Sequence, residues 1–383
     1  MIRKWALIAC GIFILGIGAG IFTANAAANM PPPGLPNSPE FGYGSVLDPY
    51  GIYVDDSINL AKNIGIRWIS LEFNWSKRWP DPNQYPDLDQ LGLTINKVKN
   101  QEQYILVSIT NPPDWAMADN GPDPRITAHL VTSLARVYSG AIQVVELYPG
   151  ANTEAGWHAK PDPKAALQVL KSSIDALESY QLDVYPILSL TPVKDGASLF
   201  DWNDLVFLKG LYDLGAAELM PIIGLSFAQI QGVPMADPDA WDKNVLRHYE
   251  LVRKIMLENN HQQGLVWITR FSWPNSYTDP NMKLPDAQAY WLNQAYELMK
   301  GQLYLGAAFF ARINPPSVDS QISSLIFPDH RLHPAAPMLS QWLDATSYTS
   351  TFSSVQIETE NHPSLQMLTK RNTSKAISKG DGL

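Results

Sequence analysis

The chain has 383 residues, of which 45% are apolar and 17% charged, so it can bury a large core and is not of the composition typical of disordered proteins. Its formal net charge of −9 argues against nucleic acid and anionic membrane surfaces as partners. Cys10 is the only cysteine and lies in an N-terminal apolar run, so the folded part can form no internal disulfide.

The N-terminal segment has the features of an export signal. An apolar run follows Arg3 and Lys4 and leads to an A-x-A cleavage pattern at residues 24–26. Residues 1–26 are therefore predicted to be a signal peptide of a secreted or cell-surface protein. The run is also about long enough to span a bilayer, so an uncleaved anchor, the only membrane contact expected, is the alternative. The proline-rich residues 27–40 are expected to form a stiff, extended linker.

The next 300 or so residues alternate between short apolar, β-branched runs and longer segments with helical periodicity. Eight such units in strict alternation predict parallel strands joined by helices, and hence an α/β fold, a single-domain (β/α)8 TIM barrel over residues 41–345. The predicted strands are 41–47, 66–73, 104–109, 142–147, 182–190, 217–225, 265–271 and 303–310. The predicted helices are 54–64, 88–100, 126–139, 163–180, 201–214, 238–259, 285–299 and 334–343. The polar residues 346–383 are expected to be a disordered tail.

The loops that follow predicted strands are longer and richer in Trp, Pro, Asn and Asp than the loops that follow helices. This asymmetry indicates that function lies at the carboxyl end of the barrel. Several tryptophans come directly after strands: Trp75, Trp79, Trp115, Trp157 and Trp273. Their flat faces could line a cleft that binds sugar rings, although packing of the loops against one another is the alternative use.

Six segments resemble, in the same order, motifs of clan A retaining glycosidases, particularly the β-xylosidase/α-iduronidase-like enzymes. The segments are 66–75 (IRWISLEFNW), 108–116 (SITNPPDWA), 133–138 (SLARVY), 146–157 (ELYPGANTEAGW), 267–273 (WITRFSW) and 333–335 (HPA). The resemblance covers nearly the whole predicted barrel and implies the same (β/α)8 fold. In the fourth of these segments Tyr148 stands for the family's Trp, while Asn152 and Trp157 match the family's residues.

Both catalytic positions of that family are changed in this chain. The resemblance places the acid/base glutamate at Gly150 and the nucleophilic glutamate at Arg270. The retaining mechanism needs two carboxylates about 5 Å apart. Glycine can neither donate a proton nor attack the sugar, and a guanidinium is no nucleophile. The resemblance therefore implies a degenerate glycosidase that no longer hydrolyses glycosides.

Other carboxylates at strand ends or in the following loops are the fallback catalytic candidates: Asp48, Glu72, Asp114, Glu146 and Glu154. Glu146 lies in an apolar strand and would be costly to bury without a partner. Arg270 is expected to form an ion pair with Glu146 or Glu72, and binding of an anionic sugar by Arg270 is the alternative. Asp114 and Glu154 could equally be solvated or turn-capping residues.

The candidate ligand-binding residues are Asn74, Trp75, Trp115, Tyr148, Asn152, Trp157, Arg270 and Trp273. No cofactor or metal is expected, because the chain has no His/Cys cluster with zinc spacing, no phosphate-binding glycine-rich loop and no G-x-S-x-G motif. The first hypothesis is a non-catalytic exported barrel that binds carbohydrate or acts at the cell surface through the inherited cleft. The alternatives are an active O-glycosyl hydrolase with relocated carboxylates and a structural surface or assembly protein.

Overall fold

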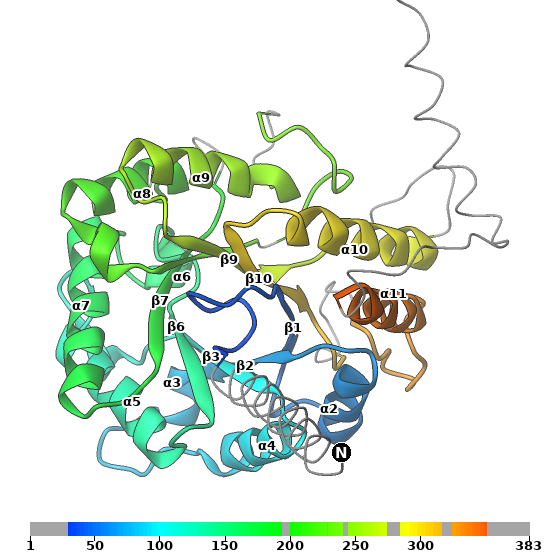
Figure 1. Cartoon of the computed structure of the whole chain (residues 1–383). Helices are drawn as coiled ribbons and strands as arrows, with labels where there is room; N and C mark the ends of the chain where they lie inside the picture. Colours follow the sequence, from blue (N-terminus) through cyan, green and yellow to red (C-terminus); the bar gives the residue numbers. More distant parts are fainter. Residues whose placement is uncertain are drawn as a thin grey trace, which may run out of the picture. The chain divides into compact units, whose positions relative to one another are not determined.

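A computed structural model of the chain describes residues 30–193, 200–227, 229–239, 244–273, 284–315 and 324–350. Eight parallel strands in these residues close into a barrel in the order β1-β10-β9-β8-β7-β6-β3-β2 (Figure 1). The predicted α/β (β/α)8 barrel is confirmed. Its strands are β1 Gly42–Leu47, β2 Trp68–Asn74, β3 Tyr104–Thr110, β6 Ile142–Leu147, β7 Tyr185–Leu190, β8 Ile222–Ser226, β9 Leu265–Phe271 and β10 Leu305–Ala311.

Helices surround the barrel on its outside (Figure 1). The longer ones are α2 Val54–Asn63, α4 Asp89–Asn100, α5 Pro124–Val137, α7 Pro163–Ser179, α8 Asp204–Asp213, α9 Tyr249–Glu258, α10 Leu284–Lys300 and α11 Ala335–Ser350. Both α5 and α7 begin with proline directly after an aspartate cap, a start that fits proline's fixed φ angle. Short elements that the sequence did not predict are α3 Trp75–Arg78, α6 Glu154–Trp157 and a hairpin of β4 Met117–Ala118 with β5 Gly121–Pro122.

Three predicted boundaries differ from the structure by five residues or more. The helix expected over 238–259 begins only at Tyr249, after a 3-10 turn at Leu246–His248 whose His248 is tied to Asp204. The sixth strand, expected from 217, begins at Ile222, because 3-10 turn Ala216–Leu219 comes first. The last helix continues to Ser350. The compact unit that contains the barrel ends at Leu343. The predicted signal peptide and most of the predicted tail lie outside the described residues.

The amino-terminal half of the barrel interior is filled by apolar side chains. Trp68 and Trp267 meet edge to face there, with ring centroids 4.9 Å apart. A larger apolar cluster fills the space between the strands and the surrounding helices. Buried apolar surface thus stabilises both faces of each strand, as expected for a parallel sheet.

Residues 33–35 close the amino-terminal end of the barrel. The indole nitrogens of Trp68 and Trp267 donate hydrogen bonds of 2.8 Å to the carbonyl oxygens of Pro33 and Gly34, and Leu35 packs into the interior cluster. A hydrogen bond of 2.7 Å from the Gly34 N–H to the Glu40 carbonyl folds the segment back on itself. This part of the proline-rich stretch is therefore a packed turn and not the extended linker that was expected.

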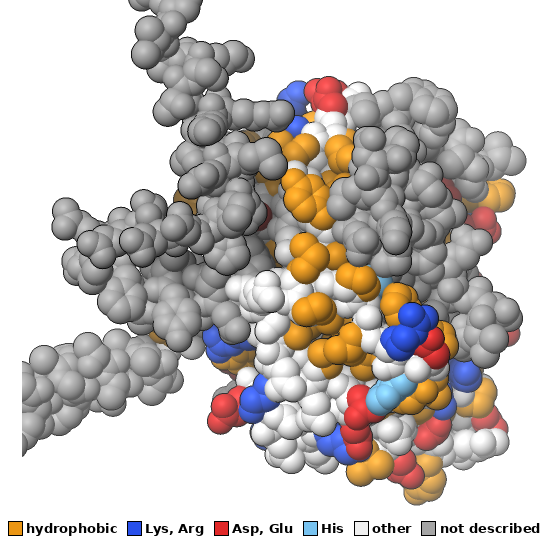
Figure 2. Space-filling model, turned by 90° about the vertical axis from the view of Figure 1, so that its right-hand side faces the viewer, with side chains coloured by type: hydrophobic (Ala, Val, Ile, Leu, Met, Phe, Trp, Pro, Cys, Tyr) orange, Lys and Arg blue, Asp and Glu red, His pale blue; other side chains and the backbone are white. Residues whose placement is uncertain are grey.

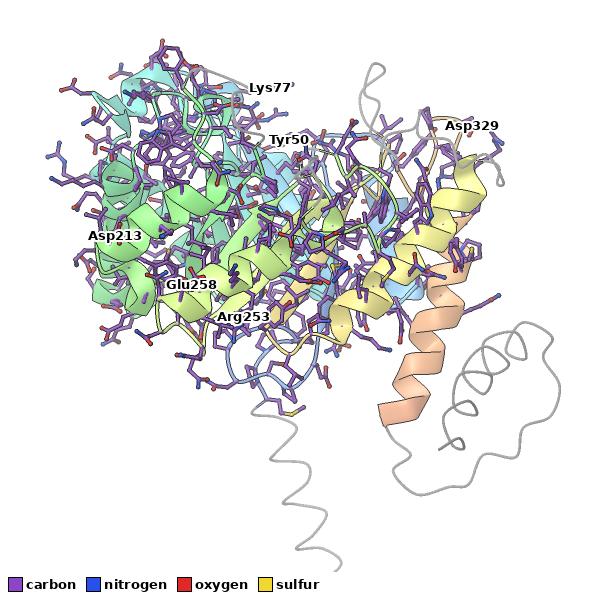
Figure 3. The ribbon with its side chains drawn as sticks, turned by 90° about the horizontal axis from the view of Figure 1, so that it is seen from above. Tyr50, Lys77, Asp213, Arg253, Glu258 and Asp329 are labelled. Atoms are coloured by element: carbon purple, nitrogen blue, oxygen red, sulfur yellow. The ribbon has the colours of Figure 1, made fainter. Side chains whose placement is uncertain are left out.

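The two ends of the barrel can be told apart in Figure 3, where Tyr50 and Lys77 lie at one end and Arg253 and Glu258 lie toward the other. Figure 2 shows the face to the right of Figure 1, where apolar side chains form a band and acidic and basic side chains lie next to one another below it. None of the helices in the described ranges has the combined length and hydropathy that a bilayer crossing requires. The N-terminal run that was weighed as an anchor lies outside these ranges.

The packed turn at residues 33–35 should depend on glycine at position 34. Gly34 has φ +83°, and a Cβ there would lie 2.5 Å from the Gly306 carbonyl oxygen, whereas Gly215 has φ +81° with no atom within 4 Å of such a Cβ. Gly215→Ala should cost about 1 kcal/mol from the backbone conformation alone. Gly34→Ala should cost about 3 kcal/mol, since a clash is added. Urea denaturation would measure the free energy of unfolding of both variants. Equal losses of stability in the two would contradict close packing of this turn against Gly306.

Candidate ligand-binding cavity

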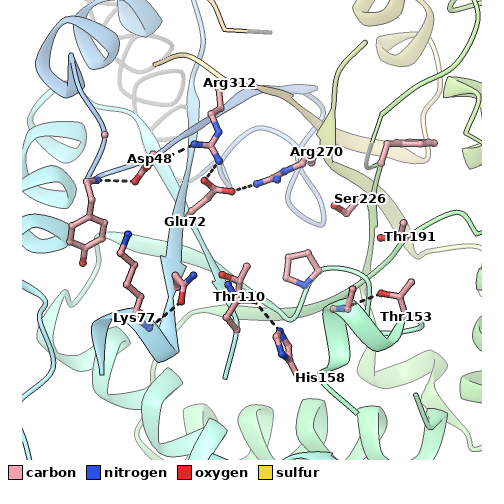
Figure 4. A pocket seen from close by; sticks show the side chains of 18 of the residues that line it. Asp48, Glu72, Lys77, Thr110, Thr153, His158, Thr191, Ser226, Arg270 and Arg312 are labelled. Carbon is pink, nitrogen blue, oxygen red and sulfur yellow. Dashed lines mark hydrogen bonds and ion pairs between the residues drawn. The ribbon is translucent and has the colours of Figure 1, made fainter. Parts of the chain in front are cut away.

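A cavity of about 1080 Å³ opens at the carboxyl end of the barrel (Figure 4). All eight strands contribute to its wall, either directly or through the residues that follow them. The contributing side chains are Asp48 after β1, Glu72 and Asn74 of β2, Thr110 of β3, Pro149 after β6, Thr191 after β7, Ser226 of β8, Arg270 of β9 and Arg312 after β10. The cavity thus occupies the place where barrel proteins carry their functional sites.

The most highly charged part of the wall is a cluster in which one carboxylate is shared by two guanidinium groups (Figure 4). Arg270 donates a hydrogen bond to Oε1 of Glu72, and Arg312 donates one to Oε2. Asp48 lies 3.8 Å from Nη1 of Arg312 and extends the cluster. Only 19% of the Glu72 side chain is exposed, so its charge depends on these partners.

The charges in this cluster hold one another in the ionised state. Burial alone would raise the pKa of the Glu72 carboxyl, but the guanidinium groups of Arg270 and Arg312 outweigh burial and hold that pKa below its usual range. Burial alone would lower the pKa of Arg270, but the negative charges of Glu72 and Glu146 keep it above its ordinary value. Glu72 is therefore a carboxylate at neutral pH and has no proton to give as a general acid.

A β-bulge places Arg270 in this cluster. The pairing of β9 shifts by one residue near Arg270, both against β8 and against β10. Thr269 reaches the Ser189 hydroxyl with an Oγ–Oγ distance of 3.4 Å, while the next residue, Arg270, reaches Glu72. Consecutive residues of a regular strand face opposite ways, so the extra residue is what turns both side chains inward.

Glu146 lies out of reach of the cavity. Its side chain is 2% exposed and is absent from the cavity wall. Ser108 donates a hydrogen bond of 2.5 Å to Oε2, and Oε1 has no hydrogen-bond partner among the described residues. Of the two ion pairs predicted for Arg270, the one with Glu72 forms as a direct contact, and Glu146 acts on Arg270 only through its charge.

Position 150 has a backbone that suits glycine. Gly150 has φ +80°, and a Cβ added there would lie 2.9 Å from Oγ1 of Thr191 and 3.1 Å from Oγ1 of Thr153. Its N–H donates a hydrogen bond of 2.9 Å to the Ser189 carbonyl oxygen. A glutamate at this position would have a strained backbone, and its Cβ would clash with Thr191. The conformation of the loop after β6 therefore favours glycine at position 150.

The tryptophans expected to line the cleft pack the loops instead, which corrects the prediction of an aromatic cleft. Trp75, Trp157 and Trp273 are at most 1% exposed, and Trp115 is half-buried. None of these four lines the cavity. Three of their indole nitrogens donate to backbone carbonyls, Trp115 to Trp79, Trp157 to Asn120 and Trp273 to Gly232. The buried indole nitrogen of Trp75 has no hydrogen-bond partner among the described residues.

Two further predicted ligand-binding residues, Tyr148 and Asn152, stabilise loops and do not line the cavity. Tyr148 is fully buried, and its hydroxyl meets the Thr127 hydroxyl at 2.8 Å. Asn152 is fully buried as well. Its amide donates to the carbonyl oxygens of Thr191 and Trp202 and accepts from the Thr191 N–H, at 2.8–2.9 Å. These contacts fix the loop after β6 against the loop after β7.

The remaining fallback carboxylates, Asp114 and Glu154, are exposed and lie away from the cavity wall. Of the other predicted site residues, Asn74 and Arg270 line the cavity. Asn74 also caps α3, since its Oδ1 accepts from the Lys77 N–H at 3.1 Å. In the described part of the chain, no group of three or more His, Cys, Asp and Glu side chains is arranged to hold a metal ion.

Several wall residues had not been singled out from the sequence: Lys77, Asn111, His158, Thr191, Asp201 and Arg312. Arg312 could have been predicted from the sequence, because it is a charged residue directly after the apolar run of the eighth strand. Asn111 and His158 carried no comparable signal, because their role depends on how two loops meet.

No protein-family model matches the sequence, and no curated protein matches it. Solved structures do match the fold. A family 39 glycoside hydrolase from Bacteroides cellulosilyticus WH2 aligns with TM-score 0.62 and 15% identity over 79% of this chain. The chain spans 63% of that structure's length. The fold is the closed (β/α)8 barrel that these glycoside hydrolase structures also have.

Two other members of this glycoside hydrolase fold are similar at comparable levels. Xylanase 10B from Thermotoga petrophila RKU-1 aligns with TM-score 0.57 and 11% identity, covering 80% of this chain and 94% of the xylanase. A β-glucosidase from Exiguobacterium marinum aligns with TM-score 0.56 and 11% identity, covering 80% and 98%. At such identities the likeness establishes the fold of the barrel, and the chemistry must be argued from the cavity itself.

Glu72 should stabilise the barrel mouth in a pH-dependent way. Glu72→Gln leaves two guanidinium groups without their shared carboxylate, so it should lower the free energy of unfolding by about 2 kcal/mol at pH 7, less than for a fully buried pair. Because the folded-state pKa of Glu72 lies below its unfolded value of about 4.3, this stabilisation is present above that pH and is lost as the pH falls through the folded-state pKa.

Denaturant titrations of wild type and Glu72→Gln at pH 7 and at successively lower pH would measure this difference, which should shrink in acid. The exposed Glu154→Gln is the control and should change stability little at any of these pH values. Equal stability of wild type and Glu72→Gln at pH 7 would show that the cluster contributes nothing.

Proposed function

We propose that this protein is a saccharide-binding barrel that does not hydrolyse glycosides. The observation that carries the proposal is the state of Glu72, the β2 carboxylate in the cavity, which is bound by both Arg270 and Arg312. A carboxylate in this position cannot act as a general acid, and as a nucleophile it would have to leave two ion pairs. Among the described residues of the wall, Glu72 therefore offers no free carboxylate to a pair of the retaining kind.

The shape and chemistry of the cavity support a ligand rather than a purely structural role. Its volume of about 1080 Å³ lies at the upper end of the range for small-molecule sites. Its wall carries hydroxyl, amide, imidazole and carboxylate groups, which are the partners that sugar hydroxyls use. A structural or assembly module would have no need to keep the barrel mouth open.

The structural neighbours agree with a saccharide ligand. Xylanase 10B from Thermotoga petrophila was determined in complex with xylobiose, and other neighbours are β-glucosidases. Export by the N-terminal segment, to the cell surface or beyond, is part of the same proposal. An active hydrolase with relocated acids is the second candidate, because Asp48 and Asp201 also line the cavity.

The deciding experiment measures reducing-end release and retention by immobilised polysaccharides on the same purified protein. We expect no reducing ends from a broad panel of plant, microbial and host polysaccharides, and retention by at least one of them. Release that disappears in Asp48→Asn, Glu72→Gln or Asp201→Asn, but persists in the control Asp213→Asn on the barrel's outer surface, would establish the hydrolase instead. Release that persists in all variants indicates a contaminating enzyme.

Restoring the two glutamates should fail to restore hydrolysis. In Gly150→Glu/Arg270→Glu, the first substitution is strained at φ +80° and the second brings a carboxylate up to Glu72. We expect the double variant to be less stable than wild type by more than about 2 kcal/mol and to release no reducing ends. A well-folded, active double variant would show that the geometry after β6 tolerates the family's catalytic residue.

A further inference from the structure

Two polar side chains on the cavity wall, Asn111 and His158, form a pair that is separate from the ion-pair cluster around Glu72. Asn111 follows β3 and His158 follows α6, and both line the cavity. Figure 4 shows His158 at the cavity. Nε2 of His158 lies 3.0 Å from Oδ1 of Asn111, within hydrogen-bonding distance. The two loops therefore present one joined pair of polar groups to whatever enters the cavity.

The backbone at both positions is unusual for a residue with a side chain. Asn111 has φ +50° and His158 has φ +58°. The carbonyl of Asn111 is fixed by a hydrogen bond of 2.7 Å from the Ser76 N–H, and the N–H of His158 donates to the Glu154 carbonyl at 2.8 Å. His158 occupies the C-cap of α6 in a left-handed conformation that helix ends usually give to glycine or asparagine. Histidine is kept there at a conformational cost.

The pair leaves one hydrogen-bond donor and one acceptor for a ligand, whichever way it is arranged. Partial burial lowers the pKa of His158, so the ring is neutral at neutral pH and carries one N–H. If that N–H lies on Nε2 and donates to Asn111, then Nδ1 accepts and the Asn111 NH₂ donates. If the Asn111 amide is turned over so that its NH₂ donates to Nε2, then Nδ1–H donates and the Asn111 oxygen accepts. A sugar hydroxyl both donates and accepts, so it fits either arrangement.

The charges of the cavity wall favour an uncharged ligand. Among the described residues, four cations and three carboxylates line it, giving +1: Lys77, Arg78, Arg270 and Arg312 against Asp48, Glu72 and Asp201. Asp87 binds Arg78 with an N–O distance of 2.9 Å and brings the sum to zero. Both guanidinium groups at the barrel mouth are already engaged by Glu72. An uncharged polyhydroxylated ligand needs no further counter-charge.

We propose that Asn111 and His158 form a subsite that binds hydroxyl groups of an uncharged saccharide in this cavity. The inference rests on the proposed function and adds to it the class of ligand and two of the side chains that recognise it.

Glycine substitutions test the subsite without straining the chain, since glycine accepts a positive φ more readily than the residues it replaces. The probes are soluble uncharged polysaccharides, namely xylan, mannan and mixed-linkage β-glucan, with polygalacturonate and alginate as charged counterparts. Isothermal titration should show that Asn111→Gly and His158→Gly each raise the Kd for the retained uncharged polysaccharide about three- to tenfold, the effect of losing about one hydrogen bond. His158→Asn, which keeps a donor and an acceptor, should lose less than His158→Gly.

Two matched controls carry the same backbone change outside the cavity wall. Asn260 has φ +57° and His330 has φ +67°, so Asn260→Gly and His330→Gly should leave the Kd unchanged. Thermal unfolding of all variants should give midpoints at or above that of wild type. A Kd that stays at the wild-type value in both Asn111→Gly and His158→Gly overturns the subsite while saccharide binding stands. Binding of the charged polysaccharides alone overturns the uncharged ligand, and binding of none overturns the proposed function itself.

Discussion

The carboxylate of Glu72, on β2, connects the carboxyl ends of β2, β9 and β10. It binds Arg270 of β9 and Arg312 after β10, and Arg312 in turn lies near Asp48 after β1, the strand that separates β10 from β2. Without this carboxylate, two guanidinium groups would face each other in a partly buried place, where like charges repel strongly. The same contact that closes this side of the barrel mouth also removes the carboxylate from acid–base chemistry. The stability of this part of the barrel and the proposed loss of hydrolysis therefore have one physical origin.

The order of strands and helices could be predicted from the sequence because alternating apolar runs and helical periods follow directly from burial. The partner of Arg270 could be narrowed to two carboxylates, Glu72 and Glu146, and no further. A β-bulge decides between them, and a bulge depends on how β9 pairs with both of its neighbours. Similarly, the helix expected from 238 is shortened by the contact of His248 with Asp204, which are 44 residues apart in the chain.

The tryptophans show a different limit of sequence interpretation. Their positions after strands were predicted correctly, but a tryptophan there can face a ligand or bury its indole against a neighbouring loop. In this protein Trp157 and Trp273 find backbone carbonyl acceptors in other loops, so the second use prevails. The cavity is left to smaller polar side chains such as Thr110, Asn111 and Thr191, which have no distinctive pattern in the sequence.

The packed turn at residues 33–35 has a consequence for how the molecule can be handled. Two indole groups hold this turn at the amino end of the barrel, whereas every strand sends residues to the cavity at the other end. A sensor chip or resin coupled through the chain that precedes Pro33 is therefore attached on the side away from the cavity. Coupling through lysine amines would also engage the exposed Lys77 on the cavity wall and would put the linker at the entrance. Immobilisation through the N-terminal side leaves the cavity facing the solution.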